Sequence, residues 1–115
     1  MGKLTTHVLD TARGLPASGV AIRLLNAVTR ELVRETRTNA DGRCDGPLLE
    51  GVSFVTGKYV LAFSAGDYFR AQGIALPDPP FVDVVEIAFG IADPNGHYHV
   101  PLLVSPWSYS TYRGS

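Results

Sequence analysis

Three histidines stand where their imidazole rings can do chemistry. His97 and His99 lie two residues apart, and His7 follows two threonines near the start of the chain. Side chains two residues apart on a strand project from one face, about 7 Å apart. Such a pair can serve in acid–base chemistry, or bind zinc if His7, Asp or Glu adds a third ligand. A solvated pair on an outer face fits the same spacing, so the pattern leaves these three interpretations open.

Arg43 and the C-terminal residues supply the remaining polar groups of interest. Arg43 follows the turn Asp41-Gly42. Its guanidinium is either solvated or a planar donor to a carbonyl-rich or anionic ligand. Tyr112 and Arg113 crowd the tail, where packing and fraying are the alternatives. A glycine-rich phosphate loop and a Gly-x-Ser-x-Gly nucleophile motif do not occur in the sequence, so a covalent serine mechanism has no support.

The composition predicts one folded domain over residues 1–115. The chain is 45% hydrophobic and 18% charged, unlike disordered chains, which combine low hydrophobicity with high net charge. Its formal charge of -1 predicts neither nucleic-acid nor membrane-surface binding. Cys44, the one cysteine, excludes an internal disulfide and any multi-cysteine metal site.

Alternation of apolar and polar residues predicts an all-β chain that positions these groups. About eight short strands and one short helix favour a two-sheet sandwich or a barrel. The strands are expected near residues 4–9, 20–24, 32–39, 43–49, 59–63, 85–91, 97–104 and 107–112, the one at 43–49 being broken by Gly46-Pro47. The helix is expected at 65–72, ended by Gly73. In the strand 97–104, Tyr98 and Val100 mark the core face, so His97 and His99 point outward.

Two blocks at opposite ends of the sequence resemble the 5-hydroxyisourate hydrolase family, the transthyretin-related enzymes of urate breakdown. The first is Leu-Thr-Thr-His-Val-Leu-Asp-Thr at 4–11. The second begins at His97 and closes with Tyr-Arg-Gly-Ser at 112–115, the ending that separates these enzymes from the hormone carrier. Trp107-Ser108 departs from the family's usual aromatic and glycine, outside the expected site.

The resemblance implies a transthyretin-like (prealbumin-like) β-sandwich that hydrolyses 5-hydroxyisourate, a cyclic amide. It implies no cofactor and no metal, and a homotetramer, a dimer of dimers with its sites at the dimer–dimer interface. The absence of a signal peptide and of a peroxisomal ending in the sequence gives a cytoplasmic expectation. Matched position by position, the implied catalytic residues are His7, Arg43, His99 and Ser115, and the implied substrate-binding residues are His7, Arg43, Tyr112 and Arg113.

Two other functions stay open at this point. One is a transthyretin-like small-molecule binding protein without turnover. The other is a non-catalytic accessory sandwich of the adhesin or carboxypeptidase-associated type, which the stretch 20–63 also resembles.

Overall fold

The computed structural model describes residues 2–114, and the secondary structure is mostly β. The strands are β1 (Lys3–Asp10), β2 (Leu15–Pro16), β3 (Ala21–Asn26), β4 (Leu32–Arg37), β5 (Leu49–Glu50), β6 (Gly57–Ser64), β7 (Val84–Ile91), β8 (His97–Val104) and β9 (Tyr109–Thr111). One α-helix, α1 (Ala65–Ala71), and a 3₁₀ turn, η1 (Gly51–Ser53), complete the elements.

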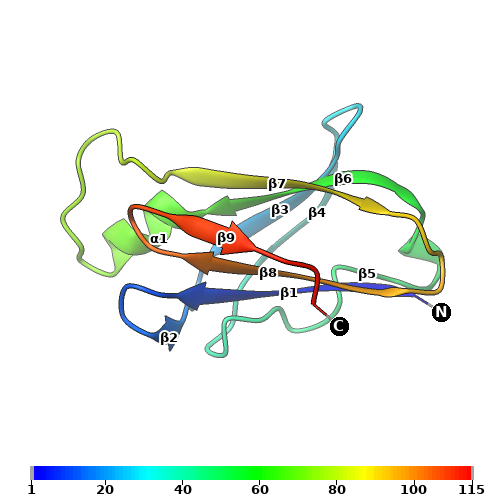
Figure 1. Cartoon of the computed structure of the whole chain (residues 1–115), viewed down its shortest axis with the longest axis horizontal. Helices are drawn as coiled ribbons and strands as arrows, with labels where there is room; N and C mark the ends of the chain where they lie inside the picture. The colour runs from blue at the N-terminus through cyan, green and yellow to red at the C-terminus, as the bar shows by residue number, and fades with distance from the viewer. Residues whose placement is uncertain (1, 115) are drawn as a thin grey trace.

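The strands form two sheets that face each other across the core (Figure 1). One sheet has the order β2-β1-β8-β9, with β5 also paired to β1, and the other has the order β4-β3-β6-β7. Most neighbours are antiparallel, but β1 and β8 run parallel, from Lys3 opposite His97 to Asp10 opposite Val104. Strands from the two ends of the chain therefore lie side by side.

The core lies between the sheets and follows the alternation of the strands. In β1 the residues at even positions are buried, and in β8 Tyr98, Val100, Leu102 and Val104 are buried. Phe63 of β6 and Phe69 of α1 are fully buried among them. Burying each such side chain contributes about 1.5–3 kcal/mol. The two-sheet sandwich and the inward face of 97–104 predicted from the sequence are confirmed.

The helix α1 is fixed to the site-bearing sheet by a buried carboxylate. Asp10, at the end of β1, is 1% exposed. It accepts hydrogen bonds from the Tyr68 hydroxyl of α1 at 2.9 Å and from the Arg13 side chain at 3.1 Å. The helix ends at Ala71, one residue before the expected end, and Gly73 follows it with a φ of 81°, a conformation that glycine adopts without steric cost.

One expected strand is wrong. Residues 43–49 form a loop, with an isolated bridge between His7 and Arg43 and with β5 starting only at Leu49. Pro47 lacks an N–H for a sheet ladder, and Gly46 beside it weakens a strand further. The last strand is also shorter than expected, because the Ser105 side chain accepts bonds from the backbone amides of Trp107 and Ser108 and holds a turn there.

The helices among residues 2–114 are too short and too polar for any of them to span a membrane.

Candidate active site

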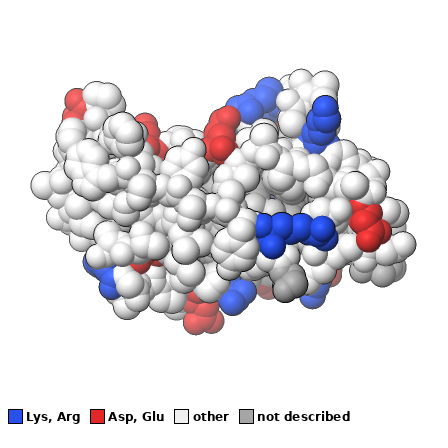
Figure 2. All heavy atoms as spheres, in the orientation of Figure 1, with Lys and Arg blue, Asp and Glu red and all other residues white. Residues whose placement is uncertain are grey.

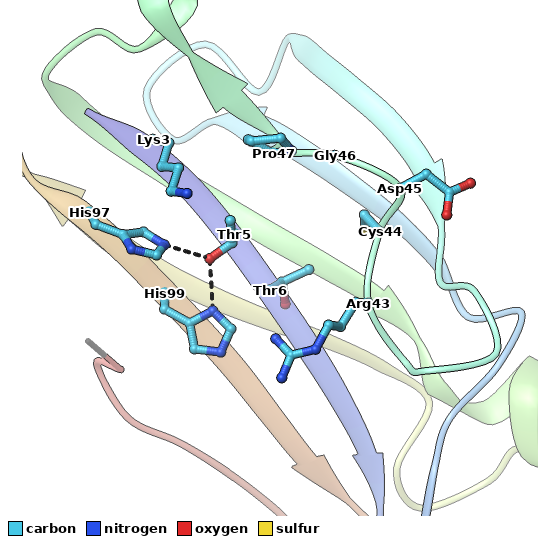
Figure 3. Close-up of a pocket in the computed structure, with 10 residues that line it drawn as sticks. All are labelled: Lys3, Thr5, Thr6, Arg43, Cys44, Asp45, Gly46, Pro47, His97 and His99. Carbon is cyan, nitrogen blue, oxygen red and sulfur yellow. Dashed lines mark hydrogen bonds between the residues drawn. The ribbon is translucent and has the colours of Figure 1, made fainter. Parts of the chain in front are cut away.

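The parallel pairing of β1 with β8 assembles a polar surface on the outer face of the sheet (Figure 3). Thr5 lies opposite His99, and Lys3 lies opposite His97. Because side chains alternate between faces of a strand, these four residues share the face away from the core. The two histidines were predicted on this outer face, and the structure adds what lies next to them.

Thr5 joins the two histidines through its hydroxyl. Its Oγ1 is 3.0 Å from Nε2 of His97 and 2.8 Å from Nδ1 of His99. The imidazole rings stand 6.4 Å apart between centroids, at 66° to each other. Figure 3 shows both rings turned toward the same hydroxyl. The His99 ring is therefore held on its Nδ1 side and presents Nε2 to the surrounding space.

Arg43 reaches this surface from the loop 39–47, which is built around an asparagine turn. The Asn39 side chain accepts bonds from the backbone amides of Asp41 and Arg43. Gly42 has a φ of 74°, and a Cβ there would lie 2.4 Å from the Val8 carbonyl, so this position needs glycine. The amide of Val8 donates to the Gly42 carbonyl at 2.8 Å, which ties the loop to β1.

His7 is held by the same loop. Its Nε2 is 2.9 Å from the Asp41 carbonyl oxygen. A carbonyl only accepts hydrogen bonds, so Nε2 carries the proton. In the neutral ring the free lone pair is then on Nδ1. His7 and Arg43 also form a backbone bridge, which places them next to each other.

A pocket of about 530 Å³ opens between the histidine pair and the loop. Its lining combines the basic side chains of Lys3 and Arg43 with the two histidines and one acidic residue, Asp45. The lining residues among 2–114 are Lys3, Thr5, Thr6, Arg43, Cys44, Asp45, Gly46, Pro47, His97 and His99; His7 lies outside this set. On the face of the molecule seen in Figure 2, basic and acidic side chains are interspersed, as expected for a nearly neutral chain.

The surroundings of His99 keep its imidazole neutral. Its pKa is lowered, first by burial and then by electrostatic effects of Arg43, His7 and His97, in that order. Since each of these effects disfavours the imidazolium form, His99 is able to accept a proton at neutral pH. Cys44 lines the same pocket, and burial raises the pKa of its thiol. The thiol therefore stays protonated and is a poor nucleophile.

The chain after β9 passes directly over His99. The Gly114 amide donates to the His99 carbonyl at 2.8 Å. A Cβ at Gly114 would come within 2.6 Å of the imidazole Cδ2, so only glycine allows this approach. The predicted catalytic residue Ser115 lies outside the described residues.

Tyr112 and Arg113 lie apart from the histidine pocket within one chain. They line a second pocket of about 240 Å³ together with Phe89 and Tyr98. The Arg113 guanidinium lies 4.2 Å from the centre of the Tyr98 ring, a cation–π contact. The structure thus brings together His7, Arg43 and His99, and it leaves the predicted substrate contacts of Tyr112 and Arg113 as a prediction.

Sequence reasoning missed Thr5 and Lys3. Both share the outward parity of His7 in the first strand, and that parity was the available signal. Their proximity to His97 and His99 depends on the parallel register with β8, which alternation alone cannot give.

For the metal alternative, residues 2–114 contain no group of three His, Cys, Asp or Glu side chains arranged to hold an ion.

Comparison with known proteins identifies the family of the chain. The model of the HIUase/Transthyretin family matches residues 4–114. The chain belongs to the HIUase/Transthyretin family. The family predicted from the two end blocks is therefore confirmed.

The chain is similar both to proteins named as enzymes and to a transthyretin with bound thyroxine. A 5-hydroxyisourate hydrolase of Ralstonia nicotianae is 61% identical over 117 residues, covering 100% of both chains. The crystal structure of (S)-allantoin synthase superposes with a TM-score of 0.94 and 49% identity over 99% of this chain, which spans 44% of that protein. Sea bream transthyretin in complex with thyroxine superposes at 0.83, with 31% identity over 97% of this chain and 94% of that one.

Proposed function

We propose that this chain hydrolyses 5-hydroxyisourate to 2-oxo-4-hydroxy-4-carboxy-5-ureidoimidazoline. The full-length identity of 61% to a 5-hydroxyisourate hydrolase supports the activity. The mechanism rests on one observation: a neutral His99 and the Arg43 guanidinium line the same pocket. A base without charge beside a fixed cation suits the attack of water on a carbonyl that becomes negative.

In the proposed reaction, water attacks the C6 carbonyl of the substrate. One histidine, His99 or His7, takes the proton of the water, and the electron pair left on oxygen forms the new C–O bond. The C6 carbonyl pair moves onto its oxygen, where Arg43 stabilises the negative charge. When that pair returns, the N1–C6 bond breaks and N1 takes the proton from the imidazolium. The sum is addition of one water molecule, with no cofactor consumed.

The tail would complete the site. Ser115 follows Gly114, whose amide donates to the His99 carbonyl. This supports a role for Ser115 as an orienting partner of the two catalytic histidines, His7 and His99. Tyr112 and Arg113 are proposed to hold the substrate ring. Their distance from the histidine pocket within one chain fits a site completed by another subunit.

We also propose a homotetramer, a dimer of dimers with sites where the dimers meet. Both β7 and β9 end their sheets in the fold of residues 2–114, so each leaves a row of backbone groups able to pair with another copy. Tyr112, just after β9, is 60% exposed, and aromatic residues are enriched at protein interfaces.

A carrier without turnover is the second candidate, since sea bream transthyretin with bound thyroxine has the same fold. The polar lining of the pocket argues for the enzyme, because an apolar ligand would leave Arg43, His97 and His99 without partners. A cytoplasmic location and a single domain over 1–115 remain predictions.

The test is to generate 5-hydroxyisourate in the cuvette from urate and urate oxidase and to follow its ultraviolet decay. We expect the decay rate to rise in proportion to added protein. Arg23→Gln, on the other sheet, should keep this rate, and His99→Ala should lower it by about 10²-fold or more. Decay unchanged by the protein would refute the enzyme. Binding of the substrate without decay would establish the carrier instead.

A further inference from the structure

The hydrogen bonds of Thr5 restrict where the protons of the two histidines can be. A hydroxyl has one proton to donate and lone pairs to accept with, and a neutral imidazole has one N–H and one bare nitrogen. Both His97 Nε2 and His99 Nδ1 lie within 3.0 Å of the same Thr5 Oγ1. If both nitrogens were bare, only one of the two bonds would exist, so at least one ring donates to Thr5.

The protonation of His99 during the reaction decides which groups donate and which accept in the hydrogen-bond chain His99–Thr5–His97. An imidazolium carries protons on both nitrogens, so its Nδ1 must then donate to Thr5. If Nδ1 already donates before the reaction, no hydroxyl has to turn when the proton arrives. The Thr5 hydroxyl is then free to donate to Nε2 of His97, which is solvent-exposed and so able to keep its own Nδ1 proton in contact with water.

We propose that Thr5 is a positioning residue that accepts the Nδ1 proton of His99 and donates its own to His97, leaving Nε2 of His99 free to accept a proton from water. The arrangement does for His99 what a carboxylate does for the histidine of a catalytic triad, but with a neutral partner. It assigns the base to His99, which lines the pocket, rather than to His7, which lies outside the pocket lining. The catalytic part of this proposal rests on the hydrolase activity proposed above.

The charges around His99 fit a neutral partner at Thr5. Basic groups dominate, and the acidic Asp45 is engaged by the Asn39 side chain at 3.0 Å. A carboxylate at position 5 would favour the imidazolium form of His99. Less of the neutral imidazole would then be available as a base at neutral pH. The titratable and charged groups that face the pocket with His99, or lie beside it, are Lys3, His7, His97, Arg43, Cys44 and Asp45.

Thr5→Val and Thr5→Ser test the proposal. Valine keeps the shape of threonine and suits a strand, whereas serine keeps the hydroxyl. Hydrogen-bond partners that orient metal-binding histidines are typically worth about 10–100-fold, and we take the same scale for a histidine that acts as a base. We expect Thr5→Val to lower kcat by about that factor with little change in KM, and Thr5→Ser to retain most of the wild-type kcat. Thr11→Val is the matched control, since the Thr11 hydroxyl also bonds to β8, at the Val104 carbonyl, and we expect it to keep wild-type activity.

The position of the proton is read without any turnover, from the ¹⁵N shifts of the His99 ring. We expect the Nδ1–H form in the wild type and in Thr5→Ser, and a shift toward the Nε2–H form in Thr5→Val at an unchanged melting temperature. An Nε2–H form in the wild type, or equal ring shifts and equal kcat in the wild type and Thr5→Val, would overturn the proposal. If the ¹⁵N result holds but the wild type does not consume 5-hydroxyisourate, the proposed function fails and the hydrogen-bond chain stands.

Discussion

At the scale of single residues, Arg43 has two separate effects in the pocket. It supplies donors for a carbonyl or an oxyanion, and its charge helps to lower the pKa of His99. These effects are separable, because the first acts on the size of the rate and the second on its dependence on pH.

Arg43→Gln removes the charge and keeps a donor. The pKa of His99 should rise, since one of the causes that lower it is gone. His99 is then protonated at a higher pH, and the acid limb of kcat/KM moves upward in pH. At the optimum we expect kcat/KM to fall by about 10²–10³-fold, the usual value of an oxyanion donor. An NMR titration of His99 alongside the pH–rate profile measures both.

Arg23→Gln is the control for the Arg43 experiment. Arg23 is an exposed arginine of β3, paired with Glu35 at 3.7 Å, and does not contribute to the pKa shift of His99. A titration of His99 that is the same in Arg43→Gln as in Arg23→Gln would contradict the electrostatic coupling.

Gly114 offers a second prediction at this scale. In Gly114→Ala the new methyl group would meet the His99 ring at 2.6 Å, so the ring or the tail has to move. We expect kcat/KM to fall at least tenfold, because misplacement by about 1 Å is costly in an active site. The melting temperature should change little, since the change lies outside the core. Wild-type activity in this variant would show that the tail leaves His99 free to adjust.

At the scale of elements, the anchor between β1 and α1 makes a prediction about stability. Asp10→Asn replaces a buried acceptor of the Tyr68 hydroxyl, the Arg13 side chain and two backbone amides by an amide that must turn an NH₂ toward donors. We expect a loss on the order of 2–3 kcal/mol, since hydrogen bonds to charged groups are worth about that. Urea unfolding measures it.

Asp67→Asn serves as the control for the anchor. Asp67 lies on α1 but its side chain is 81% exposed, and surface substitutions usually change stability by about 0.5 kcal/mol or less. Equal urea midpoints for the two variants would mean that the buried carboxylate does not anchor the helix.

The elements also show what the sequence can and cannot predict. Alternation correctly predicted that His97 and His99 face outward, because burial on one face of a strand imposes a period of two. The same signal missed Thr5, since its importance comes from a neighbouring strand that is distant in sequence. It was wrong at 43–49, where Leu48 and Leu49 are buried from a loop and a two-residue strand. The turn at Asp41-Gly42 drew attention to Arg43, but only the family resemblance chose a functional role for it over a solvated one.

At the scale of the whole molecule, the edge strands β7 and β9 lead us to predict that copies of the chain assemble into a tetramer. Sedimentation should give four times the chain mass of 12.4 kDa. If subunits complete one another's sites, activity per chain should fall when dilution dissociates the assembly. A monomeric protein with full activity would contradict both the tetramer and a shared site.

The pairing of β1 with β8 has a consequence for how the molecule comes into being. Thr5 and His99 are separated by 94 positions, and closing a loop of that length costs about 2 kcal/mol more than closing one of ten residues. Synthesis proceeds from the N-terminus, so β1 leaves the ribosome long before its parallel neighbour exists. The pocket is therefore among the last parts of the molecule to form. During refolding, the appearance of activity should lag behind the formation of the β3–β6–β7 sheet, whose strands are linked more locally.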